Sequence, residues 1–167
     1  MFLKKIPLIF ALLLLTACGY HLRGDIELPA GMENIYVEGA SNALQQEMKK
    51  ALKSSQGKLV ATQSEAGIVI KFAKEQTTSR VMAINTAGRA NQFQLIYHVD
   101  FAIYDPAGKL LLGDQNVNIK RDYFNDQTAI LGKNNEEVVI RVEMYQQAVS
   151  SIMSRINLAM ENKAITK

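Results

Sequence analysis

The sequence predicts an α+β fold in which two helices pack on one face of a four-stranded, mixed but mostly antiparallel sheet. Residues 91–104 alternate apolar and polar side chains, which is typical of a strand with one buried face. Residues 138–156 repeat apolar side chains at spacings of four and three, which indicates a helix. The order of elements is β-α-β-β-β-α. Only the first strand–helix–strand unit is therefore expected to pair its strands in parallel, through a right-handed crossover.

The chain begins with the pattern of a secretory leader. Two lysines precede the apolar run 6–15. That length suits a signal peptide and falls short of the roughly 20 apolar residues of a membrane-spanning helix. Leu15-Thr16-Ala17-Cys18 resembles the bacterial lipobox, in which the chain is cut before a cysteine that carries diacylglycerol. We therefore expect residues 1–17 to be a lipoprotein signal peptide and Cys18 to be the lipidation site.

Lipidation of Cys18 would tether the mature chain to a membrane. One acyl chain binds a membrane only marginally, whereas bacterial lipoproteins of this class resemble one another in carrying three. Gly19 stands where an Asp tends to retain Gram-negative lipoproteins at the inner membrane. We therefore expect anchoring at the outer membrane, with the domain facing the periplasm. Cys18 is the only cysteine, so no internal disulfide is possible.

The first half of the mature chain is predicted as an irregular lead-in, a strand and a helix. Pro29 and Gly31 interrupt residues 19–34, and 35–37 form a short β-type run. Ser41 or Asn42 is expected to cap an amphipathic helix of about 14 residues that ends near Gly57. A second strand begins near Ile68, and its strand character extends towards Val81.

Two long strands joined by a turn make the clearest local prediction. Apolar residues fill alternate positions of 91–104, and residues 110–123 return with the same period. In Asp105-Pro106-Ala107-Gly108, proline presets φ at the second position and glycine supplies a positive φ at the end. The other face of this hairpin is polar, and we expect it either to be wet or to meet a polar partner. Its residues are Gln92, Gln94, His98, Asp100, Asn116, Asn118 and Lys120.

Two connections and a long helix complete the chain. Glycine and small polar residues in 78–90 predict a loop that exposes Arg80 and Arg89. A second connection, 125–135, holds Lys133 and precedes a helix of about 25 residues that Asn134 or Asn135 could cap. We expect one domain over residues 18–160, followed by a frayed tail, 161–167.

Composition excludes several functional classes. The leader holds two of the 19 lysines and arginines, so 17 remain against 16 acidic side chains in a mature chain of ordinary domain size. That near-neutral balance argues against nucleic-acid binding. The two histidines lack metal-ligand spacing, and neither a nucleophile elbow nor a phosphate-binding loop is present. We therefore expect no enzyme activity, metal or cofactor.

Four segments, in order, resemble the LptE family of lipopolysaccharide-assembly lipoproteins. They are Cys-Gly-Tyr-His-Leu-Arg at 18–23, the loop-to-strand segment 85–97, Lys-Arg-Asp-Tyr at 120–123, and 134–145. The resemblance covers nearly the whole chain. It implies the same two-helix, four-stranded fold, a one-to-one complex with the LptD β-barrel as a plug and assembly aid, and contact with lipopolysaccharide.

The resemblance also implies where lipopolysaccharide is held. The family uses a lysine just before the second helix, which corresponds to Lys133, and a basic residue in the loop before the central strand. The position that matches the second residue lies close to Thr86, so Arg89 is the nearest substitute. Further candidates are Arg80, Lys120 and Arg121. The alternative is that all five are solvated surface charges.

A different envelope role remains open from the residues alone. A lipid anchor, a small α+β domain and the lack of a catalytic group would also suit a periplasmic lipoprotein that serves as adaptor or pilot for another machine. The resemblance in the four segments separates the two hypotheses.

Overall fold

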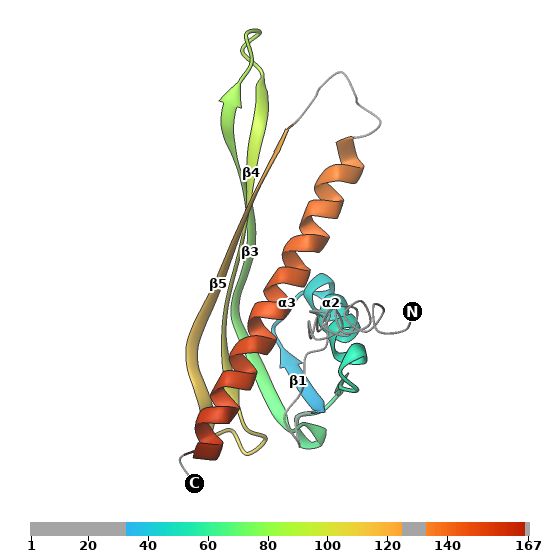
Figure 1. Cartoon of the computed structure of the whole chain (residues 1–167), viewed down its shortest axis with the longest axis vertical. Helices are drawn as coiled ribbons and strands as arrows, with labels where there is room; N and C mark the ends of the chain where they lie inside the picture. Colours follow the sequence, from blue (N-terminus) through green and yellow to red (C-terminus); the bar gives the residue numbers. More distant parts are fainter. Residues whose placement is uncertain (1–32, 125–132, 166–167) are drawn as a thin grey trace, which may run out of the picture.

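The computed structural model describes residues 33–124 and 133–165. The predicted leader, Cys18, the lead-in up to residue 32 and the connection 125–132 lie outside the described residues. The described residues form, in order (Figure 1), β1 (Asn34–Glu38), α2 (Asn42–Ser54), β2 (Lys58–Leu59), the 3₁₀ turn η3 (Gln63–Glu65), β3 (Ile68–Ile84), β4 (Ala90–Tyr104), β5 (Leu110–Phe124) and α3 (Lys133–Ile165).

The strands form one mixed sheet in the order β2-β1-β3-β4-β5. β1 runs parallel to β2 and β3, whereas β3, β4 and β5 are antiparallel. The predicted α+β class and the parallel first unit are confirmed. The predicted strand count is wrong by one, because β2 is a two-residue strand paired through Asn34↔Lys58 and Ile35↔Leu59. Two residues carry no periodicity by which a strand could be recognised.

β3 is longer than the sequence predicts, and this changes the position of Arg80. The residues predicted as a loop from 78 onwards continue β3 as far as Ile84, paired from Thr78↔Ile96 to Ile84↔Ala90. Only a tight turn, 85–89, remains between the two strands. The error arose because β3 is exposed on both faces beyond residue 77, so no hydrophobic alternation marked it.

The β4–β5 hairpin matches its prediction. Leu95, Tyr97, Val99, Phe101 and Ile103 are buried, and so are Val117, Ile119 and Tyr123 on the neighbouring strand. These side chains form the inner face of the sheet. At the turn, the Asp105 carboxylate accepts from the Lys109 amide and Gly108 has φ of +83°. We call the opposite, largely polar side of β3–β5 the outer face.

Both helices contribute to the core that covers the inner face. α2 inserts Leu44, Met48 and Leu52, while α3 buries a stripe that includes Ala148, Ile152 and Ile156. α3 starts at Lys133, before the predicted cap at Asn134 or Asn135, and continues to Ile165 into the segment predicted as a tail. Val138, expected to join the apolar stripe, is 58% exposed. The first turns of α3 therefore contribute little to the core.

A β-bulge in β3 joins the sheet to α2. Pairing shifts between Phe72↔Phe101 and Lys74↔Asp100, so Glu75 faces inward opposite Val99. The Glu75 carboxylate accepts from the amide and the hydroxyl of Ser41, both at 2.7 Å. Ser41 is the N-cap of α2, where the helix dipole favours a negative charge. The bulge thus fixes the start of α2 against the sheet.

Replacement of the Glu75 carboxylate tests this link. Glu75→Gln keeps the size of the side chain but removes the charge that accepts from Ser41. We expect unfolding free energy to fall by about 1–3 kcal/mol, as measured by urea denaturation. Glu65→Gln on the exposed turn η3 is the matched control and should cost under about 0.5 kcal/mol. Equal, small losses in both variants would contradict the link.

Tyr97 gives the fold a pH dependence. Its hydroxyl donates to Glu75 at 3.0 Å, and burial, followed by the Glu75 charge, raises the pKa of Tyr97 far above its usual range. The unfolded chain ionises this phenol near pH ~10, so the unfolded state loses the proton first and stability falls above that pH. Tyr97→Phe should lessen the decline in unfolding free energy by up to ~1.4 kcal/mol per pH unit. Denaturation at several alkaline pH values measures the slope, and identical slopes would contradict this assignment.

Candidate functional site: the outer face and the hairpin tip

The two foremost candidate residues lie towards the same end of the molecule. Arg89 ends the β3–β4 turn and is exposed, and Lys133 is the first residue of α3 (Figure 1). The Asn85 side chain holds the turn by accepting from the amides of Ala87 and Arg89, both at 3.0 Å. Gly88 takes φ of +73°, which favours glycine. A short, backbone-bonded turn therefore presents Arg89 at the tip.

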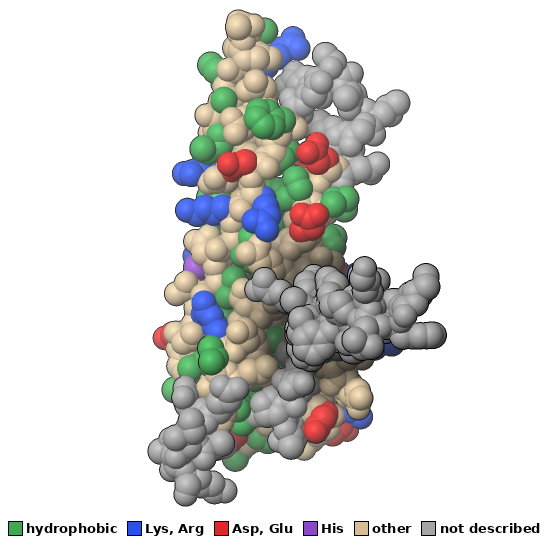
Figure 2. Space-filling view, in the orientation of Figure 1, with side chains coloured by type: hydrophobic (Ala, Val, Ile, Leu, Met, Phe, Trp, Pro, Cys, Tyr) green, Lys and Arg blue, Asp and Glu red, His purple; other side chains and the backbone are tan. Residues whose placement is uncertain are grey.

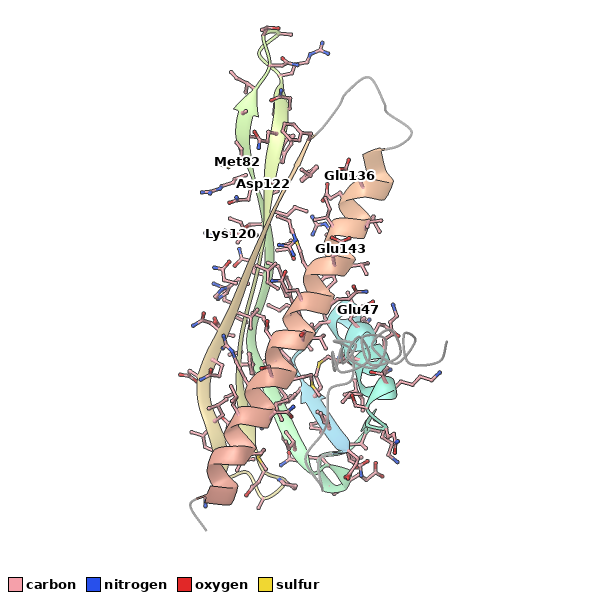
Figure 3. The ribbon with its side chains drawn as sticks, in the orientation of Figure 1. Glu47, Met82, Lys120, Asp122, Glu136 and Glu143 are labelled. Carbon is pink, nitrogen blue, oxygen red and sulfur yellow. The ribbon has the colours of Figure 1, made fainter. Side chains whose placement is uncertain are left out.

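Arg80 and Lys120 lie on the outer face, on opposite sides of β4. Arg80 pairs with Gln94 of β4, and Lys120 pairs with Ile96, two residues further along the same strand. Gln94 donates to the Asp122 carboxylate at 2.6 Å. Figure 3 shows Lys120, Asp122 and Met82 on the side of the sheet that faces away from α3. The outer face here thus combines two cations with one carboxylate.

Arg121 does not join this surface. Neighbouring residues in a strand point to opposite faces, so Arg121 lies on the helix side. Its guanidinium donates to the Gln147 side chain on α3 at 2.6 Å. The five candidates therefore divide among the tip, the outer face, the helix side and the start of α3, rather than forming one cluster.

Exposed apolar side chains gather around the same end, and no periodic pattern in the sequence marks them. The end of β3 exposes Val81, Met82 and Ile84. Phe124, the last residue of β5, is exposed as well and pairs with Gln92 of β4, which in turn pairs with Ala83 of β3. Their exposed fractions are 53%, 44%, 66% and 67%. Figure 2 shows apolar side chains intermixed with basic and acidic ones along this half of the molecule. Once β3 is known to reach Ile84, the sequence itself locates this apolar group.

A polar chain connects the start of α3 to β5. Tyr123 donates its hydroxyl to Glu137 at 3.1 Å, and Arg141 pairs with the same carboxylate at 2.7 Å. Burial, and then the Glu137 charge, raises the pKa of Tyr123. The exposed turns of α3 are therefore held to the sheet by hydrogen bonds as well as by packing.

The opposite half of the outer face is more acidic. Glu38, Asp100 and Asp114 line a hollow of about 600 Å³ beside the β3 bulge. The Lys71 ammonium lies 3.1 Å from the Glu38 carboxylate, and His98 Nε2 lies 2.9 Å from the Asp100 carboxylate. Within residues 33–124 and 133–165, no group of His, Cys, Asp and Glu is arranged to hold a metal ion. In the same ranges, no helix is long and apolar enough to cross a membrane.

Comparison with known proteins assigns most of the described chain to one family. The family model described as "LptE: Lipopolysaccharide-assembly" matches residues 32–156. The LPS-assembly lipoprotein LptE of Pectobacterium atrosepticum is 22% identical, over 87% of this chain and 80% of its own. That of Yersinia pestis strain Pestoides F is 23% identical, over 87% and 71%.

Solved structures share the fold. Lipoprotein B from Nitrosomonas europaea superposes with a TM-score of 0.68 at 22% identity, over 87% of this chain and 94% of the other. The rare lipoprotein B from Shewanella oneidensis gives 0.59 at 22%, over 80% and 97%. The family match covers three of the four segments on which the resemblance rests, and it includes α2, every described strand and α3 as far as residue 156. This chain belongs to the LptE family of lipopolysaccharide-assembly lipoproteins.

Proposed function

We propose that this chain is a non-enzymatic plug and assembly aid for an LptD β-barrel, bound one-to-one, and that it contacts lipopolysaccharide during delivery to the outer leaflet. The observation that carries the proposal is the two-sided sheet. Its inner face holds a complete core with α2 and α3, while its outer face presents amides, histidine and charged groups. The lumen of a membrane barrel is polar. A domain that folds on its own core and is polar outside suits that environment.

The lipid anchor completes this proposal. Cys18 would attach the mature chain, 18–167, to the outer membrane, with the domain in the periplasm and the lumen. The near-neutral mature chain supports a lumen partner, because a polar lumen does not require a strong opposite charge. The described domain would then be held beside the barrel by the anchor and inside it by its polar surface.

Arg89 and Lys133 are the proposed lipopolysaccharide contacts. They come from different elements and lie towards the same end, where Val81, Met82 and Ile84 are also exposed. Lipopolysaccharide joins phosphates to acyl chains, so cations beside apolar side chains suit both parts of it. Arg80 and Lys120 are secondary candidates on the outer face. Arg121 is less favoured, because its guanidinium already donates to Gln147.

Co-purification tests the partner. Mature, Cys18-lipidated chain isolated from its own outer membranes should bring down one large β-barrel in equal amount, and the domain within the lumen should resist added protease. Recovery of a secretion or cell-wall component instead would favour the adaptor or pilot role. Recovery of no barrel would contradict the plug proposal.

Charge reversal tests the ligand. Arg89→Glu with Lys133→Glu removes two charge-assisted donors, each worth roughly 1.5–3 kcal/mol, so affinity for lipopolysaccharide should fall at least about ten-fold. The measurement is binding of purified lipopolysaccharide to the mature domain. Lys53→Glu with Lys109→Glu makes the same change in net charge away from the tip and should leave affinity within about two-fold. Equal losses in both pairs would indicate unspecific charge attraction.

A further inference from the structure

The edge of β3 is unpaired over most of its length. β1 pairs with β3 only from Ile35↔Ile68 to Glu38↔Lys71. From Lys74 to Val81, β3 pairs with β4 without interruption, and further register shifts follow near Ala83. No strand among the described residues lies against the other side of this stretch. We call residues 74–81 the free edge. A strand edge of this kind presents unpaired amide and carbonyl groups.

The free edge is charged only towards its two ends, at Lys74, Glu75 and Arg80. Edges are usually blunted by charge, proline or short length. The other open edge, β5, is charged at four positions: Asp114, Lys120, Arg121 and Asp122. On the free edge, Lys74, Glu75 and Arg80 leave the uncharged run Gln-Thr-Thr-Ser at 76–79, which has no proline and two β-forming threonines. The unpaired main-chain groups of this run are available to another strand.

We propose that the free edge accepts an extended segment of the barrel partner as an added strand, a contact that rests on the proposed function. Main-chain hydrogen bonds would supply affinity, and alternate side chains would supply specificity. On the outer face, Lys74 and Arg80 favour carboxylates on the added strand, since opposite charges across neighbouring strands attract. On the inner face, Thr77 and Ser79 favour small polar or β-branched residues. The occupant is therefore an extended segment with acidic side chains on one face.

A second copy of this chain fits the free edge less well. An antiparallel copy centred on Thr77 would place Lys74 of each chain opposite Arg80 of the other. Like charges directly opposite one another destabilise strand pairing. In this register the charges therefore favour a different, acidic strand over self-pairing.

Amide hydrogen exchange tests the added strand directly. The mature chain is compared free and in complex with the barrel, residue by residue. An added strand bonds every second residue, so alternate amides of 74–81, those not already bonded to β4, should slow by at least about ten-fold. Amides of the β5 edge, 114–122, are the internal control and should change less. Burial by side chains alone would slow exchange without the two-residue period.

Three outcomes would overturn the inference. A complex that forms while the free edge exchanges as before excludes the added strand but leaves the plug role intact. If the chain without the barrel shows the same alternating protection, and this protection increases with protein concentration, the edge pairs with a second copy of the chain. Failure to form any complex would overturn both the inference and the proposed function.

A side-chain variant gives an independent readout. Lys74→Glu sets a like charge against the proposed acidic strand, so affinity for the barrel should fall by roughly two- to five-fold. Lys109→Glu in the β4–β5 turn is the matched control and should bind as the parent does. Circular dichroism of both variants checks that the fold is kept. Equal affinity of the two variants would contradict the charge preference assigned to the occupant.

Discussion

The β-bulge between Phe72 and Lys74 divides the molecule into two halves, and the rest of the structure follows from that division. Before it, β3 lies between β1 and β4 and contributes apolar side chains to the core. At it, the register shift turns Glu75 inward to meet the N-cap of α2 and the Tyr97 hydroxyl. Beyond it, β3 leaves β1 and continues only as part of a three-stranded antiparallel extension. One inserted residue thus both anchors α2 and begins the extension.

The two halves have different physical characters. The half with β1, β2 and α2 buries its apolar groups, including Leu44, Met48 and Ile68. Among the described residues, the extension, β3 to β5 beyond the bulge, meets α2 on its inner face through Glu75 and Ser41 and is otherwise covered there by α3. The contact with α3 is partly polar, through Tyr123, Glu137 and Arg141. The extension exposes aliphatic side chains that a free domain gains nothing by exposing. This imbalance suits a chain whose core folds alone and whose extension acts against a partner.

How far the sequence predicts this structure depends on burial. β4 and α3 have one buried face, so period two and the four–three spacing reveal them, and with them the α+β class. The distal part of β3 is exposed on both faces, so its sequence resembles that of a loop. For that reason the sequence predicted Arg80 in a loop rather than in a strand. β2 is too short to have a pattern. For the candidate site, strand alternation alone predicts that Lys120 and Arg121 lie on opposite faces of the sheet. That Arg89 and Lys133 lie towards the same end of the molecule follows only from the tertiary structure.

A chain that plugs a barrel has its outer face enclosed by the barrel wall. Asn118 lies in the middle of that face, exposed and opposite His98. Asn118→Cys introduces a thiol that a membrane-permeant maleimide can label in intact outer membranes, while the native cysteine is expected to be blocked by lipid. Enclosure predicts labelling that is fast in the isolated domain and strongly slowed when the barrel is present, with Lys53→Cys on α2 as the comparison. Equally fast labelling at Asn118→Cys with and without the barrel would contradict enclosure.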